Sequence, residues 1–150
     1  MVMVRDTTTG GNFEAIVKAC IGRSCQKNEL QAYEQRFVGG KPGGGRHKID
    51  YELVSLRDEN IRGLVSCKKQ GTSGTAQEKV AYEVIKLLHT MEQDQRYRHA
   101  WLVLGGNGWS QDIKQFLRNE IQKWIPELQK KRLTIILSTD ELMDADISLG

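Results

Sequence analysis

Polar side chains follow an apolar run in residues 64–70, which read LVSCKKQ. Alternate side chains of a strand point to opposite faces, so Ser66, Lys68 and Gln70 would share one face. A lysine there can discourage pairing at a sheet edge, or it can act chemically beside an acid. The chemical interpretation therefore requires a carboxylate close to Lys68 in the fold.

An acid lies on the preceding strand of a predicted hairpin. Residues 48–54 alternate with period two, with Ile49, Tyr51 and Leu53 on one face and Asp50 on the other. The segment RDEN then predicts a turn, and residues 61–68 return as an antiparallel strand. Asp50 is therefore expected opposite the end that carries Ser66 and Lys68, where the side chains could meet.

The rest of the chain predicts alternating helices and strands around this hairpin. A helix of about ten residues is expected from Phe13, followed by a short helix or irregular connection over 29–35 and a brief strand in RFVGG. Further on, a capping box at 75–78 precedes a helix with an apolar stripe from Val80 to Met91. Then come a strand at 100–106, a helix at 113–124 and a strand at 132–139. The order α, hairpin, α, β, α, β predicts an α/β fold with a mixed sheet between helices.

Size and composition indicate one soluble domain that spans residues 1–150. Hydrophobic residues make up 39% and charged residues 27%, and no apolar run is long enough to span a membrane. The opening residues do not form a signal peptide, so a cytoplasmic location is expected. The three cysteines lack CxxC spacing, which argues against a disulfide framework or a structural zinc. The formal charge of +3 is too small to hold nucleic acid by itself, so the distribution of charge matters more.

Asp50 and the Ser66 to Lys68 segment, in this order of elements, resemble the PD-(D/E)xK nuclease superfamily over about residues 10–139. The resemblance implies a restriction endonuclease-like core. It also implies that an acid on the first hairpin strand, and an acid-x-Lys on the second, bind a divalent metal and activate water. Two positions depart from the pattern, since Ile49 replaces a proline and Ser66 replaces the second acid. Some restriction endonucleases of this superfamily also have Ser-x-Lys, and the following helix supplies their missing carboxylate.

Two glutamates on the following helix are candidates for that carboxylate. On a helical projection Glu83 lies roughly 80° from the centre of the apolar stripe, and Glu78 roughly 140°. Glu83 is favoured because it borders the core, whereas Glu78 has a sufficient role in the capping box. The alternative is a boundary glutamate paired with Lys79 or Lys86. Glu52, two residues after Asp50, is the reserve candidate.

The resemblance also assigns roles around the metal. Asp50, Glu83 and the carbonyl of Cys67 would hold Mg²⁺, a hard cation that prefers oxygen ligands. Lys68 would orient water, help it lose a proton or neutralise the transition state, and Ser66 would donate or accept a hydrogen bond. Glu14 lies where the family often places a further glutamate, although a first-turn acid also favours the helix macrodipole.

A glycine-rich basic loop precedes the predicted hairpin and is suited to contact DNA phosphates. The same role is expected near the end of the second strand, where backbone amides of residues 71–75 could contribute. Such a loop can also be a mobile connector. The expected DNA-binding side chains are Lys41, Arg46, His47, Lys48, Lys69 and Gln70.

The favoured function is a Mg²⁺-dependent, site-specific DNA endonuclease of the restriction or homing type. One domain of this size cuts one strand, so double-strand cleavage requires a homodimer, a higher oligomer or a partner subunit. A structure-selective repair or recombination nuclease is an alternative. A second alternative is a noncatalytic DNA-binding subunit on a degenerate nuclease fold. A third is an unrelated α/β binding domain in which Lys68 is only an edge lysine.

Overall fold

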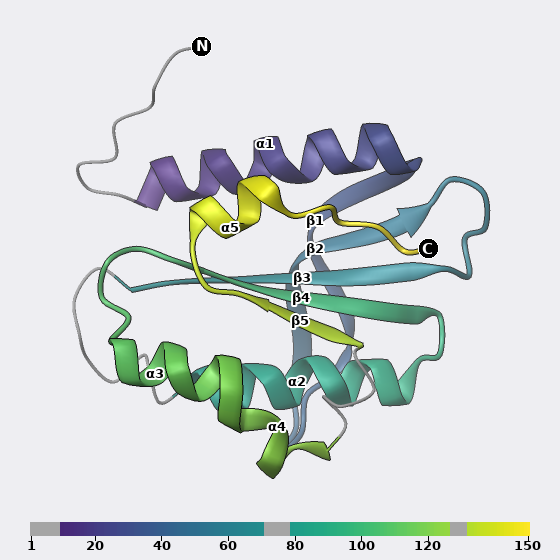
Figure 1. The fold of residues 1–150 in the computed structure, drawn as a ribbon. Helices are drawn as coiled ribbons and strands as arrows, with labels where there is room; N and C mark the ends of the chain where they lie inside the picture. The colour runs from purple at the N-terminus through teal and green to yellow at the C-terminus, as the bar shows by residue number, and fades with distance from the viewer. Residues whose placement is uncertain (1–9, 71–78, 127–131) are drawn as a thin grey trace.

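A computed structural model describes residues 10–70, 79–126 and 132–150 of the chain. The described part contains a five-stranded sheet and helices on both of its faces (Figure 1). In chain order, its elements are α1 (Gly10–Asn28), β1 (Leu30–Gly40), β2 (Arg46–Ser55), β3 (Arg62–Lys69), α2 (Val80–Gln93), β4 (Tyr97–Gly105), α3 (Gln111–Gln115), the π-helical turn η2 (Phe116–Glu120), α4 (Ile121–Trp124), β5 (Leu133–Ile136) and α5 (Thr139–Asp144).

The sheet is mixed, as the sequence predicts. Its strands lie in the order β1-β2-β3-β4-β5. The pairs β1–β2 and β2–β3 are antiparallel, whereas β3–β4 and β4–β5 are parallel. Parallel neighbours need a crossover, and α2 supplies the first while the segment from α3 to α4 supplies the second. The expected α/β class is therefore confirmed.

Each face of the sheet buries its own apolar cluster. Helices α1 and α5 cover one face, where Phe13 and Val17 pack with Trp101 and Leu142. Helices α2, α3 and α4 lie on the other face in Figure 1, and there the cluster includes Val80, Val84, Leu87, Leu102 and Leu117. Full burial of one such side chain stabilises a fold by about 1.5–3 kcal/mol, so both layers contribute to holding the sheet rigid.

The prediction for residues 29–35 is wrong, because this segment belongs to the edge strand β1. Only Leu30 and Val38 are buried in this strand, and its other side chains are partly or fully exposed. An exposed edge strand does not need the alternation that identifies a half-buried strand in a sequence. The backbone is also unusual at Gln35, which has a φ of 55°.

The predicted alternation of β2 holds on each side of Asp50 but not across it. Tyr51 and Leu53 pack in the cluster beneath α1, whereas Ile49 packs in the cluster beneath α2. In Figure 1 the β1–β2 pair bends away from the plane of the other strands toward α2. Asp50 therefore lies at the point in β2 where the buried side chains change from the face beneath α2 to the face beneath α1.

Several boundaries differ from the predicted ones. Helix α1 has 19 residues rather than about ten, and α5 was not predicted. The capping box at 75–78 lies outside the described residues, and in the structure α2 begins at Val80. None of the helices in the described ranges is both long and apolar enough to cross a membrane.

Candidate functional site

Asp50 lies where β2 and β3 separate. Their cross-strand pairs run from Val54–Arg62 to Tyr51–Val65. One residue further, Oδ2 of Asp50 accepts a hydrogen bond of 2.7 Å from the backbone N–H of Cys67. The N–H and C=O of a strand residue point toward the same neighbouring strand, so the Cys67 carbonyl also opens toward β2 at this separation.

The surroundings of Asp50 have opposing effects on its carboxyl group. Burial raises the pKa of Asp50, while the Cys67 N–H and the charge of Lys68 act in the opposite direction. The negative charge of Glu83 also raises this pKa. Asp50, Lys68 and Glu83 are thus close enough to influence one another electrostatically, although they come from three different elements.

Lys68 and Glu83 form an ion pair across the sheet–helix interface. Nζ of Lys68 lies 2.9 Å from Oε1 of Glu83, and Nζ of Lys86 lies 3.1 Å from the same oxygen. The Glu83 side chain is only 5% exposed, whereas that of Lys68 is 43% exposed. Burial alone would raise the pKa of Glu83, but the two lysines outweigh it and hold the pKa below its usual value. The pairing with Lys86 that the sequence offered as an alternative is therefore present, Glu83 also contacts Lys68, and its role as a metal ligand stays a prediction.

Ser66 and Gln70 are buried residues of the same segment. Alternation along β3 places Ser66 on the face of Lys68, toward α2. Because only 3% of Ser66 is exposed, its short side chain lies beneath the surface, and Gln70 at 9% exposure does not offer the open phosphate contact expected from the sequence.

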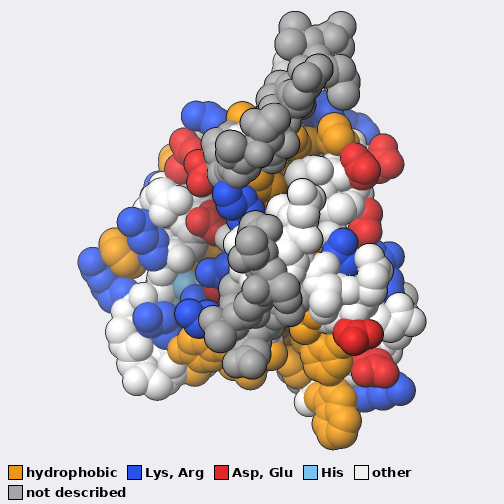
Figure 2. All heavy atoms as spheres, turned by 90° about the vertical axis from the view of Figure 1, so that its left-hand side faces the viewer, with side chains coloured by type: hydrophobic (Ala, Val, Ile, Leu, Met, Phe, Trp, Pro, Cys, Tyr) orange, Lys and Arg blue, Asp and Glu red, His pale blue; other side chains and the backbone are white. Residues whose placement is uncertain are grey.

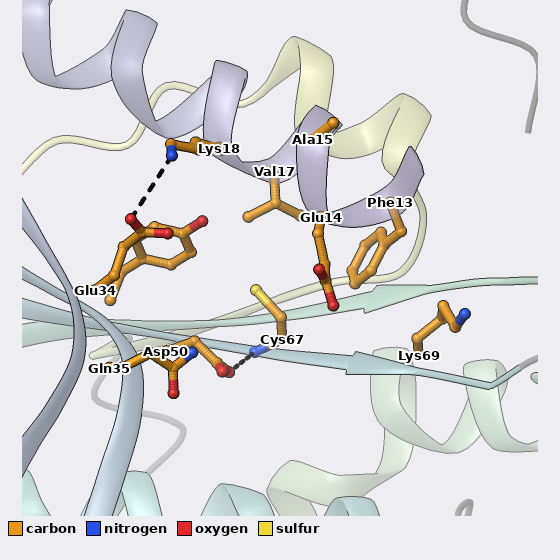
Figure 3. A pocket seen from close by; sticks show the side chains of 11 residues that line it. Phe13, Glu14, Ala15, Val17, Lys18, Glu34, Gln35, Asp50, Cys67 and Lys69 are labelled. Atoms are coloured by element: carbon orange, nitrogen blue, oxygen red, sulfur yellow. Dashed lines mark hydrogen bonds and ion pairs between the residues drawn. The ribbon is translucent and has the colours of Figure 1, made fainter. Parts of the chain in front are cut away.

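A pocket of about 590 Å³ opens on the other side of the strand separation, beneath α1. Glu14 from α1, Asp50 from β2 and both Cys67 and Lys69 from β3 line it. In Figure 3 the Glu14 side chain points from the helix toward the sheet near Cys67. Burial, reinforced by the charges of Asp50 and Glu14, raises the pKa of the Cys67 thiol and favours its protonated form.

The oxygen groups around Asp50 fit a hard divalent cation better than a soft one. Asp50 and Glu14 line one pocket, and strand geometry directs the Cys67 carbonyl to the same side as the N–H that binds Asp50. Within the described ranges, no group of three or more His, Cys, Asp and Glu side chains is already arranged to hold a metal ion. Backbone oxygen and water would therefore have to complete the coordination, as is usual for Mg²⁺.

Glu52, the reserve candidate, belongs to a different cluster. Its carboxylate contacts Arg62 at 3.2 Å and Arg36 at 3.7 Å, and it accepts a hydrogen bond from the Tyr97 hydroxyl. These contacts join β1, β2, β3 and β4 inside the sheet. Glu52 therefore has a structural role, and we do not keep it in the candidate site.

The expected phosphate-binding residues divide into exposed and buried groups. Arg46, Lys48 and Lys69 are exposed, and Lys41 is partly so. His47 is fully buried, and its Nδ1 lies 2.7 Å from Oγ1 of Thr90, so the expectation that it contacts phosphate is wrong. The reason is the alternation of β2, which turns His47 inward between two exposed basic residues. The backbone amides of residues 71–75 lie outside the described ranges.

Gln35 is a site residue that the sequence interpretation missed. It lines the pocket with Asp50, and its side chain favours the charged form of that carboxyl through a hydrogen bond. Its positive φ distorts β1 beside the bend in β2. No motif identifies Gln35 in the sequence, because its role depends on β1, which was not predicted there.

Comparisons with known proteins identify one family model and one solved structure to which the chain is similar. A family model for the PD-(D/E)XK nuclease superfamily domain matches residues 10–146. Among solved structures, the MspJI restriction endonuclease in complex with a 27-mer oligonucleotide is 14% identical, with a TM-score of 0.39. That match covers 87% of this chain but only 26% of the endonuclease chain. The search of curated proteins found no match.

Proposed function

The chain belongs to the PD-(D/E)XK nuclease superfamily, and on this basis we propose that it is a Mg²⁺-dependent DNA endonuclease. The observation that carries the proposal is the position of Asp50 at the separation of β2 and β3, beside the Lys68–Glu83 pair. Hydrolysis of a phosphodiester needs both negatively charged metal ligands and a cationic group near the scissile phosphate. In this proposal Asp50 and Glu83 supply the ligands and Lys68 supplies the cationic group.

The proposed metal ligands are the carboxylates of Asp50 and Glu83 and the carbonyl of Cys67, with Glu14 contributing through water or a second ion. When bound, Mg²⁺ would polarise the phosphate and lower the pKa of the attacking water. The Cys67 N–H holds one oxygen of Asp50 at 2.7 Å, which fixes the orientation of its carboxylate. The separation of the strands leaves the Cys67 carbonyl free of the β2 ladder in the described pairing.

Lys68 supplies the cation in this proposal. Its Nζ is held at 2.9 Å by Glu83, yet 43% of its side chain is exposed, so the ammonium can reach a phosphate at the surface. There it would orient the attacking water or neutralise charge on the transition state. Ser66 lies deeper on the same face and would hydrogen-bond to a ligand or water rather than act as a nucleophile.

The proposed substrate is duplex DNA, cut at specific sites. Arg46, Lys48, Lys41 and Lys69 would contact phosphates around the site. Cleavage of both strands would need a second active site, from a homodimer, a higher oligomer or a partner subunit. A role in repair or recombination would use the same chemistry on a different DNA structure. The cytoplasmic location expected from the sequence stays a prediction.

A noncatalytic DNA-binding subunit is the second candidate function. The observation in its favour is Ser66, which provides no carboxylate on β3, together with the engagement of Glu83 by both Lys68 and Lys86. If Glu83 stays paired with the two lysines and no metal binds, the domain would bind DNA without cutting it.

Plasmid cleavage with Mg²⁺ or with a chelator distinguishes these functions. Asp50→Asn and Lys68→Met should each reduce cleavage by about 100-fold or more while the protein stays folded. Glu59→Gln is the matched control, because Glu59 is an exposed acid in the turn at the opposite end of the same hairpin. Cleavage by Asp50→Asn at the wild-type rate would exclude the proposed site, and DNA binding without cleavage by the wild-type chain would support the noncatalytic function.

A further inference from the structure

The distal part of the β1–β2 hairpin extends beyond the rest of the sheet as a two-stranded ribbon. In the described pairing, β3 contacts β2 from Tyr51 to Val54, whereas β1 pairs with β2 as far as Gly40–Arg46. Residues 37–40 and 46–49 therefore form a ribbon that contains only β1 and β2. We call this segment the distal ribbon.

The inner face of the distal ribbon is fixed to the body of the protein. Val38 and Ile49 are buried in the cluster that includes α2, and His47 is linked to Thr90 of α2 at 2.7 Å. At the tip, the Tyr82 hydroxyl donates a hydrogen bond of 2.9 Å to the Pro42 carbonyl. The ribbon is thus held in one position, so binding a partner through its outer face would cost little conformational entropy.

The outer face combines an exposed aromatic ring with two cations. Phe37 is 50% exposed, and it is the cross-strand partner of Lys48. The Arg46 guanidinium lies 3.7 Å from the centre of the Phe37 ring, and Lys48 Nζ lies 5.9 Å from it. In Figure 2, basic side chains surround an exposed hydrophobic group on the lobe at the left, where the bent end of β1 and β2 lies.

These two cations have no acidic partner among the ion pairs of the described residues. The proximal part of β1 carries a similar stack, with the Arg36 guanidinium 4.6 Å from the centre of the Tyr33 ring. There, however, Arg36 is paired with Glu52 at 3.7 Å. The distal ribbon therefore keeps a net positive outer face, and the proximal stack is largely neutralised.

We propose that the outer face of the distal ribbon binds in the major groove of the DNA and contributes to sequence recognition, an inference that rests on the proposed function. The major groove admits a two-stranded ribbon, and apolar side chains there contact base edges such as the thymine methyl. Phe37 is the base-contacting residue, and Arg46 and Lys48 bind the phosphates on either side. The Arg46 stack holds the ring in place and carries the charge that a phosphate attracts.

Selection from a pool of random duplex DNA, in chelator so that no strand is cut, tests this assignment. The wild-type chain should enrich particular sequences, and Phe37→Ala should lose that preference by about tenfold at one or two positions. Its affinity for unselected DNA should stay near the wild-type value. Arg46→Gln with Lys48→Gln should instead weaken binding to all sequences and reduce the salt slope by about two. Tyr33→Ala is the matched control and should select the wild-type sequences.

Three results would each overturn the assignment: no enrichment by the wild-type chain, an unchanged preference in Phe37→Ala, or an equal loss for selected and unselected DNA. Phe37→Leu, which keeps an apolar side chain, is the second variant if Phe37→Ala does not fold. It should also change the preferred sequences. Cleavage in Mg²⁺ is measured separately, so a chain that selects DNA but does not cut it would contradict the nuclease proposal while supporting the ribbon.

Discussion

Asp50 lies between two groups of charged side chains, one on each face of the sheet. Beneath α1, Asp50 shares a pocket with Glu14 and Lys69. Toward α2, the charges of Lys68 and Glu83 shift its pKa in opposite directions. A bend in β2 makes this possible, because a straight strand would direct Asp50 to one face only. The second acidic ligand can therefore come from either face, and the two choices predict different mutants.

We expect Glu83→Gln to lose cleavage by about 100-fold or more, comparable to Asp50→Asn. The substitution removes a carboxylate that Lys68 contacts at 2.9 Å, so both the metal site and the position of the lysine change. Glu14→Gln should reduce cleavage less, because its proposed contact is through water. Steady-state cleavage over a range of Mg²⁺ concentrations provides the measurement.

Glu52→Gln would be a poor control for these variants because Glu52 stabilises the sheet. Glu92→Gln serves instead, because Glu92 is exposed and lies on the same helix as Glu83. If Glu14→Gln proves inactive and Glu83→Gln active, the second ligand lies beneath α1. The Lys68–Glu83 pair would then be structural.

Asp50, Lys68 and Glu83 could be predicted as site residues because the family resemblance indicates which elements to search and each of these elements has clear periodicity. The projection placed Glu83 at the border of the apolar stripe, and the structure shows it in contact with Lys68. The inward direction of His47 follows from the same alternation, but the glycine-rich composition of the preceding segment predicts a loop that continues to Lys48. Gln35 could not be predicted, since its position depends on a distorted edge strand.

Among the elements, the end of β3 depends on a close approach by the β4 turn. Gly106 has a φ of +85°, and a Cβ added there would lie 2.4 Å from the Gln70 carbonyl oxygen. The N–H of Gln70 also donates to the Gly105 carbonyl at 3.1 Å. These contacts fix the end of the strand that carries Lys68 and Lys69.

Gly106→Ala should therefore lower the free energy of unfolding by about 1–3 kcal/mol, through backbone strain and the clash with Gln70. It should also reduce cleavage, because the end of β3 has to move. Gly22→Ala in α1 is the matched control, since an added Cβ there meets nothing within 4 Å and alanine favours a helix. Chemical unfolding and plasmid cleavage measure the two effects. A Gly106→Ala protein as stable and active as wild type would show that β3 does not depend on this contact.

The fixed position of the distal ribbon on α2 gives the fold a pH dependence through His47. Burial lowers the pKa of His47, and the charges of Lys86, Lys41 and His89 lower it further while Glu83 partly opposes them. The unfolded chain therefore binds a proton more readily than the folded one. Stability is complete above the unfolded value of about 6.5 and declines as the pH falls below it.

We expect His47→Gln to flatten the decline in the free energy of unfolding between about pH 7 and about pH 5. It should not abolish the decline, because burial also lowers the pKa of His99. Urea unfolding across this range is the measurement, with His99→Gln as the comparison. An identical slope in His47→Gln and wild type would contradict a buried neutral His47.

On the scale of the whole molecule, the order of elements was largely predictable, because α2 is strongly amphipathic and the parallel strands β4 and β5 are mainly apolar. The edge strand β1 and the short helix α5 lack such a signal. Their positions depend on tertiary contacts with α1, such as the ion pair of Lys18 with Glu34 of β1 and the hydrogen bond from Arg23 to the Met143 carbonyl of α5. The bend of the β1–β2 pair likewise appears only when both strands and α2 are packed together.

The described residues contain one proposed active site per chain, and this predicts the course of double-strand cleavage. One site hydrolyses one phosphodiester at a time, so a chain acting alone should convert supercoiled plasmid to the nicked form before any linear product. If a homodimer cuts both strands, the rate of linear product should rise more steeply than in proportion to protein concentration. Mixing wild-type chain with an excess of Asp50→Asn should then yield nicked plasmid, because mixed dimers carry one active site. Direct formation of linear DNA at concentrations where sedimentation shows only monomer would contradict this, since one site would then have cut both strands.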